Sequence, residues 1–162
     1  MDHFVDRSSP EDRRTSLDHL TLGIRGEEIA AAYLQQAGYR IVAANFTVPV
    51  GRNRNDVVIS AEIDLVAYDG PTLCFIEVKT RASDWFAPPS VNVDLRKQRQ
   101  ISRAARAYRR IFGLANASYR YDVLSIVLPA ESELNRPEIE LLRNFWSEEK
   151  FRKHSWQKRY WD

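Results

Sequence analysis

The chain has 162 residues, of which 44% are hydrophobic and 28% are charged, and its formal net charge is +2. These values are typical of one soluble domain of ordinary size with a sufficient core. Its single cysteine, Cys74, excludes an internal disulfide and a zinc site built on several cysteines. Cys74 lies in an apolar run, so its thiol is expected in the core. A chain without a disulfide is typical of a reducing compartment.

Targeting signals are missing from the sequence as it stands. No run reaches the roughly 18 apolar residues that a membrane span needs. The first residues, MDHFVDRSSPEDRRTSLDH, lack the apolar segment of a secretory signal. We therefore expect a cytoplasmic protein that does not contact a membrane.

The N-terminal third of the chain is expected to hold an arm, a helix and a strand. Residues 1–16 are polar, carry Pro10 and are expected to form a disordered arm. The pattern from Leu17 to Gly38 is helical, and Gly38 stands where a glycine often ends a helix. Tyr39–Val48 is expected to be a strand, and residues 49–59 a loop or the end of an extended hairpin.

The remaining pattern predicts an α/β domain with a mixed β-sheet flanked by helices, in the order α-β-β-β-α-β with room for one more short strand. The domain should span residues 17–146, with a basic and aromatic tail at 147–162. Two strands are joined by the turn DGPT, and a loop, a helix and further strands follow. In chain order these elements are Ala61–Tyr68, Leu73–Lys79, the loop 81–93, the helix 94–112, Tyr119–Leu128 and Ile139–Leu142.

The two strands around DGPT predict a pair of opposed carboxylates. A two-residue Asp-Gly turn would place Pro71 in the ladder, where it cannot donate a hydrogen bond. A four-residue loop, Asp69–Thr72, avoids this and sets Asp64 opposite Glu77. By the same register Glu62 stands opposite Lys79 on the same face, because side chains of a strand alternate.

Opposed carboxylates repel each other unless a proton, a lysine or a metal intervenes. Mg²⁺ binds carboxylate oxygens and keeps several waters, so Asp64 and Glu77 suit it or Mn²⁺. Lys79 could then orient a water or stabilise charge on a phosphate. This set predicts metal-assisted hydrolysis of phosphodiesters. The alternative is a solvated sheet face with alternating charges.

The first helix offers a third carboxylate. At 100° per residue, Gly23, Gly26, Ala30 and Leu34 form one stripe, and Glu27 lies inside it. A carboxylate in a buried stripe needs a partner. The two glycines would allow close approach to another backbone. Glu27 is therefore a candidate site residue, or else an acid favoured by the helix dipole.

The second helix separates apolar and basic residues. Ile101, Ala104, Ala105 and Tyr108 share one side. Five arginines share the other and form a candidate nucleic-acid-binding surface, since arginine pairs with phosphate oxygens. We call this surface the arginine face: Arg96, Arg99, Arg103, Arg106 and Arg110. Lys97 lies on the apolar side, from which it can point toward the site. A merely solvated face remains the alternative, although such faces usually mix charges.

The C-terminal tail, FRKHSWQKRYW, interleaves aromatic and basic residues. It could stack on bases, pack on the domain or mediate oligomers. The three histidines, His3, His19 and His154, have no metal-binding spacing.

Together these residues resemble the YraN-like family of bacterial proteins, which are related to Holliday junction resolvases within the restriction-endonuclease-like superfamily. The similarity runs from about Gly23 to Tyr121. The motifs that carry it are G-x-x-G-E at Gly23–Glu27, AEIDLVA, FIEVK and the strand start Arg120–Val123. The resemblance implies a restriction-endonuclease-like fold with Asp64 and Glu77 as metal ligands, Lys79 assisting, and Glu27 completing the acidic cluster.

Departures from the family pattern concern the surroundings of the site. Ala61 replaces a glycine, Thr47 replaces an arginine, and about eight residues are inserted within 48–59, which puts substrate preference in doubt. We expect an Mg²⁺-dependent endonuclease acting on branched or damaged DNA. A homodimer is expected by resemblance, because resolvases make two cuts. The alternatives are a non-catalytic nucleic-acid-binding module and an assembly protein.

Overall fold

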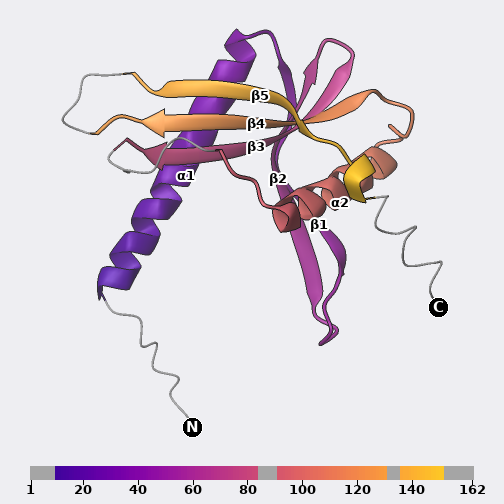
Figure 1. Ribbon diagram of the computed structural model, residues 1–162, viewed down its shortest axis with the longest axis horizontal. Coiled ribbons are helices and arrows are strands. Elements are labelled where there is room, and N and C mark those ends of the chain that lie inside the picture. The colour runs from indigo at the N-terminus through magenta and orange to yellow at the C-terminus, as the bar shows by residue number, and fades with distance from the viewer. Residues whose placement is uncertain (1–9, 84–90, 131–135, 152–162) are drawn as a thin grey trace.

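The computed structural model describes residues 10–83, 91–130 and 136–151, with side chains from residue 18 onward. One five-stranded sheet runs in the order β1-β2-β3-β4-β5, with β3 and β4 parallel and the other neighbours antiparallel. Figure 1 shows these elements. Their bounds are α1 Pro10–Gln36, β1 Arg40–Arg52, β2 Val58–Asp69, β3 Thr72–Ala82, α2 Leu95–Ile111, β4 Tyr119–Leu128 and β5 Glu138–Trp146. The predicted mixed α/β fold is confirmed, and this order fits a restriction-endonuclease-like core.

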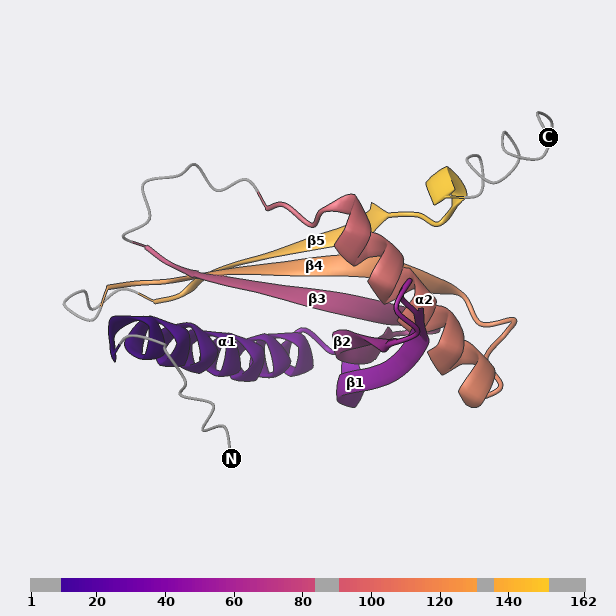
Figure 2. The same cartoon turned by 90° about the horizontal axis from the view of Figure 1, so that it is seen from below.

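The helices cover opposite faces of the sheet, as Figure 2 shows. Helix α2 makes the crossover that parallel strands β3 and β4 require. It begins after Asp94, whose carboxylate accepts a hydrogen bond from the Lys97 amide at 2.7 Å. Ile101 and Tyr108 on α2 pack with Phe75 on β3 in the larger core cluster. The predicted apolar side of this helix is therefore its buried side.

The second core cluster lies beneath α1. Ala30 and Leu34 of the helix pack with Cys74 and Ile76 of β3. Cys74 is buried as expected, and burial raises the pKa of its thiol to about 12. Gly38, with φ of 90°, follows the helix in the left-handed conformation that glycine tolerates.

The start of the first helix and the turn between β2 and β3 differ from the prediction, and β1, β2 and β5 are longer than predicted. Helix α1 begins at Pro10, so residues 10–16 are helical and not disordered; proline is well suited to a first helical position. Residues 1–9 lie outside the described part. The turn between β2 and β3 is Gly70–Pro71, because Asp69 and Thr72 still pair. The expected register is nevertheless correct, with Tyr68 opposite Leu73 and Val66 opposite Phe75.

Strand β2 changes its side-chain pattern at Asp64. Ile63 and Val66, an odd and an even position, both pack in the cluster under α2, whereas Leu65 packs in the cluster under α1. The pairing of β1 with β2 skips the opposite position, Asn45, whose φ is 51°. The prediction that all even positions of this strand share one face is therefore wrong, because a local irregularity interrupts the alternation.

Candidate functional site

The site begins where β2 and β3 separate. Their ladder ends at Leu65 and Ile76, one step before Asp64 and Glu77 would pair. The Asp64 carboxylate instead accepts a hydrogen bond from the Val78 amide at 2.8 Å. A side chain thus replaces the backbone partner at this fork. The two carboxylates are brought together as expected, although they are not a ladder pair.

Glu77 lies between two lysines. It is only 3% exposed, and its Oε1 atom lies 3.1 Å from Lys79 Nζ. Its Oε2 atom lies 3.6 Å from Nζ of Lys97, which reaches the site from the first turn of α2. This second oxygen is buried and has no hydrogen-bond partner among the described residues. Such an unsatisfied charged atom is rare in a structural ion pair and is typical of a site that takes a ligand.

Helix α1 delivers the third carboxylate through a close contact with β3. Gly26 is buried against Thr80, and a Cβ atom at this glycine would lie only 1.8 Å from Thr80 Oγ1. This close approach sets the next residue, Glu27, beside the fork. Gly23 has nothing within 4 Å of such an atom, so only one of the two predicted glycines is needed for packing.

An acidic cluster forms at this point from two elements, α1 and β2. Carboxylate oxygens of Glu27, Glu62 and Asp64 all lie within 4.8 Å of one another. The side-chain nitrogen of Asn45, in the orientation that its neighbours favour, donates to Glu27 Oε2 at 3.2 Å and to Glu62 Oε1 at 3.0 Å. One amide thus holds two carboxylates in place beside the third.

The surroundings of Asp64 raise the pKa of its carboxyl group. Burial raises the pKa of its carboxyl, and Glu77 raises it further, to about 7. The Val78 amide and Lys97 act in the opposite direction but do not outweigh these effects. The fold therefore holds this carboxylate where its charge is poorly compensated, a common property of functional sites.

The residues present fit a hard divalent cation. Carboxylate oxygens are the ligands that Mg²⁺ and Mn²⁺ prefer. The cluster offers one from each of Glu27, Glu62 and Asp64, and a positive ion would relieve the repulsion that raises the Asp64 pKa. The buried Oε2 atom of Glu77, which accepts no hydrogen bond from the described residues, is a further possible oxygen ligand.

Sequence reasoning gave no role to Glu62 or Asn45, although Glu62 was expected on the same face. Glu62 could have been found from the sequence, because it stands two residues before Asp64 in β2. Asn45 could not be found in this way, because its role depends on the left-handed backbone of an irregular strand.

The arginine face is separate from this cluster. Helix α2 points Lys97 toward Glu77 and turns the arginine face toward solvent. Arg103, Arg106 and Arg110 line a groove with Pro49 and Val50 of β1. The inserted hairpin, residues 48–59, thus forms one wall of a basic groove.

Two of these arginines have partners within the domain. Arg106 Nη2 lies 2.9 Å from Glu148 Oε2, and the Arg99 guanidinium lies 5.5 Å from the Phe151 ring. Glu148 also accepts a hydrogen bond from Tyr121 at 2.5 Å. The start of the predicted tail therefore packs on α2. Residues 152–162, with His154 and most of the aromatic pattern, lie outside the described part, as does His3.

Comparison with known proteins places the chain in a family. Residues 26–126 match the family described as uncharacterised protein family UPF0102. The chain belongs to that family. This confirms the resemblance to the YraN-like proteins.

Members of UPF0102 from several bacteria cover most of the chain. A UPF0102 protein of Geobacter sulfurreducens is 41% identical over 123 residues, which span 76% of this chain and 86% of the relative. One from Chlorobium phaeobacteroides is 43% identical over 70% of this chain and 81% of its own. The matched segment of this UPF0102 protein contains every residue of the acidic cluster. No helix in the described residues is long and apolar enough to cross a membrane.

Proposed function

We propose that this UPF0102 protein is a metal-dependent endonuclease that hydrolyses phosphodiester bonds of DNA, with Mg²⁺ or Mn²⁺ held at the fork of β2 and β3. The observation that supports it most is the group formed by Asp64, Glu77 and Lys79. The half-buried Asp64 carboxylate, whose pKa is raised to about 7, and the buried Glu77 carboxylate stand beside an ammonium group. Glu27 and Glu62, which cluster with Asp64, are the further candidates to hold the ion.

Each side chain has a separate task in this proposal. Asp64 and Glu77 hold the cation, and Glu27 and Glu62 complete its surroundings. When bound, a divalent cation would act as a Lewis acid and lower the pKa of a bound water. Lys79, 41% exposed at the edge of the cluster, can donate to a phosphate oxygen or to the attacking water.

The arginine face supplies affinity for the substrate in this proposal. Arg103 and Arg110 are exposed, and neither has an acidic partner among the described residues. Arg96 and Arg110, both on the arginine face, are separated by about 21 Å along the axis of one helix. A polymer with regularly spaced phosphates, such as DNA, can contact both ends of α2 at once.

A non-catalytic nucleic-acid-binding module is the second candidate. It is favoured by the ion pairs of Glu77, which place a lysine near each of its oxygens and can balance its charge without a metal. Such a module would bind DNA in a salt-sensitive manner and leave it intact under any divalent metal.

One experiment separates the two candidates. Labelled single-stranded, duplex, flap and four-way-junction DNA is incubated with Mg²⁺ or Mn²⁺ and either wild-type protein or Asp64→Asn. We expect cleavage by the wild type and a loss of at least about a hundredfold in the variant. Asp18→Asn, an exposed aspartate of α1, is the matched control and should cleave normally. Binding without cleavage by wild type would favour the module.

A further inference from the structure

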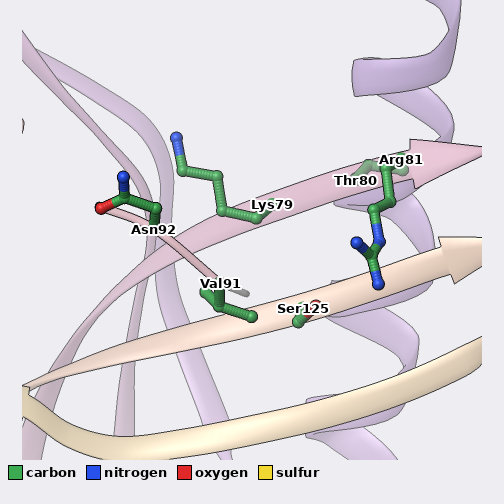
Figure 3. Close-up of a pocket in the computed structure, with 6 residues that line it drawn as sticks. All are labelled: Lys79, Thr80, Arg81, Val91, Asn92 and Ser125. Carbon is green, nitrogen blue, oxygen red and sulfur yellow. The ribbon is translucent and has the colours of Figure 1, made fainter. Parts of the chain in front are cut away.

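A pocket of about 220 Å³ continues from Lys79 along the sheet. Its lining comes from three segments: the end of β3, the middle of β4 and the residues that precede α2. Figure 3 shows the six lining residues, which are Lys79, Thr80, Arg81, Val91, Asn92 and Ser125. Lys79 and Arg81 alternate with Thr80 on β3, so their side chains leave the same face of the sheet.

The pocket has two ends. In Figure 3 the Lys79 ammonium points toward the end where Asn92 lies, and the Arg81 side chain points toward Ser125 at the other. Lys79 and Ser125 are paired in the parallel ladder of β3 and β4. The first end adjoins the fork of β2 and β3, where Lys79 forms an ion pair with Glu77. The second end has no role in the hydrolysis described above.

The polar groups of this second end suit an anion. Arg81 and Ser125 can both donate hydrogen bonds to a ligand, and no carboxylate is among the six described residues that line the pocket. Neither Arg81 nor Ser125 has an ion pair or a side-chain hydrogen bond within the described parts of the chain. A guanidinium beside a hydroxyl is a common arrangement for binding phosphate oxygens.

Ser125 presents a hydroxyl group to the pocket from a core strand. The residue is only 8% exposed in the middle of a core strand, between Leu124 and Ile126. Among the described residues, the buried side-chain atoms without a hydrogen-bond partner belong to Glu77 and Arg109, so the Ser125 hydroxyl is not one of them and opens to the pocket. This hydroxyl has no partner among the described residues, and the residue lines the pocket. The hydroxyl is thus available to a bound group.

We propose that Arg81 and Ser125 bind a second phosphate of the nucleic acid, next to the phosphate that is cleaved. This inference rests on the proposed function, which places the reacting phosphate near Lys79. Arg81 stands two residues further along β3, a step of about 6.6 Å in a strand. Neighbouring phosphates of one nucleic-acid strand are separated by a similar step. Val91 gives the pocket an apolar wall that a sugar can contact.

The ligand could also be a free phosphate ion, so the test has two arms, both in metal-free buffer with EDTA. In the first, inorganic phosphate is titrated while backbone amide NMR signals of Arg81, Asn92 and Ser125 are followed. In the second, binding of a fluorescein-labelled 12-base-pair DNA duplex is measured over a range of salt concentrations. Neither arm requires cleavage, so an inactive protein can still pass both.

The variants are Arg81→Ala and Ser125→Ala, with Arg136→Ala as the control because Arg136 is exposed and lies outside the pocket. We expect Arg81→Ala to weaken duplex binding about tenfold and to lower the slope of affinity against salt by about one phosphate contact. Ser125→Ala should weaken it about threefold while its thermal midpoint stays equal or rises. A fall in that midpoint would instead show a structural serine and would contradict the assignment.

The remaining outcomes decide the source of the phosphate. If Arg81→Ala weakens the binding of both inorganic phosphate and the DNA duplex, the proposal is supported. Arg81-dependent binding of inorganic phosphate, with duplex binding unchanged, would make the pocket a site for a free anion and overturn it. Equal duplex binding by wild type, Arg81→Ala and Arg136→Ala would overturn it as well. Failure of DNA cleavage alone would contradict the proposed function and not this binding site.

Discussion

Buried carboxylates occur in two regions of this molecule and are treated in opposite ways. At the C-terminal side, Asp122 is fully buried and accepts hydrogen bonds from Arg120 Nε at 2.9–3.0 Å and from the Asn144 amide at 2.8 Å. At the fork of β2 and β3, Asp64 has one backbone hydrogen bond and faces another carboxylate. One region satisfies its charges, and the other leaves them poorly satisfied.

Glu148 shows the same contrast through its pKa. Burial raises it, but the hydrogen bond from Tyr121 and the contact with Arg106 outweigh burial, so its pKa lies below the ordinary value. Asp64, with a lysine and no arginine nearby, has a pKa raised to about 7. The difference teaches that burial alone does not mark a functional acid. The marker is burial for which the protein supplies too few partners.

The largest expected effect is on the satisfied side. Asp122→Asn should destabilise the fold by roughly 3–5 kcal/mol, because it removes one of the two carboxylate partners of Arg120, Asp69 being the other, and replaces a fully buried acceptor oxygen by an amide nitrogen that cannot accept from Arg120 Nε. Urea unfolding monitored by circular dichroism measures it. Glu138→Gln, at an exposed position of β5, should change stability by less than about 0.5 kcal/mol. If both variants were equally stable, Asp122 would not be a structural carboxylate, and the contrast with Asp64 would be lost.

Asp64→Asn should have the opposite sign. The unfolded carboxyl ionises near 3.8 and the folded one near 7, so the folded state binds more protons between these values. Wild-type stability should therefore fall as pH rises from about 4 to 7. The asparagine can still accept the Val78 hydrogen bond.

The variant should accordingly be more stable than wild type by roughly 2–3 kcal/mol above pH 7, and equally stable near pH 4. Unfolding midpoints at both pH values, without metal, measure this difference. A variant that is less stable than wild type at pH 8 would place Asp64 with the structural carboxylates.

The smallest expected effect concerns how Glu27 reaches the acidic cluster. Gly26→Ala should destabilise the fold by roughly 1–3 kcal/mol, because the short, branched Thr80 side chain cannot move aside easily. Gly23→Ala, in the same helix with open space around it, should stabilise by up to about 1 kcal/mol. Thermal unfolding of the pair measures both. Two variants of equal stability would mean that α1 does not depend on this contact.

The sequence allowed much of this arrangement to be predicted. The apolar alternation of β2 and β3 and the position of Pro71 gave the register that sets Asp64 near Glu77. Helical periodicity separated Lys97 from the arginine face and placed Glu27 toward the sheet. These predictions depend on local periodicity, which regular elements preserve.

What could not be predicted depends on irregular backbone and on partners distant in the chain. The role of Asn45, whose side-chain amide donates to Glu27 and Glu62, depends on its left-handed backbone. The Glu148 partners come from α2 and β4, so nothing near residue 148 indicates them. The unpaired hydroxyl of Ser125 becomes visible only when the pocket around it is known.

The central claim is that the fork holds a carboxylate whose charge a divalent cation would balance. The most direct measurement is the titration of Asp64 by carbon-detected NMR of its carboxyl, without metal and with Mg²⁺ at millimolar concentration. We expect a midpoint near 7 without metal, a fall of at least about one unit with Mg²⁺, and no change at Glu148. An ordinary midpoint near 3.8, or one that Mg²⁺ leaves unchanged, would contradict the account.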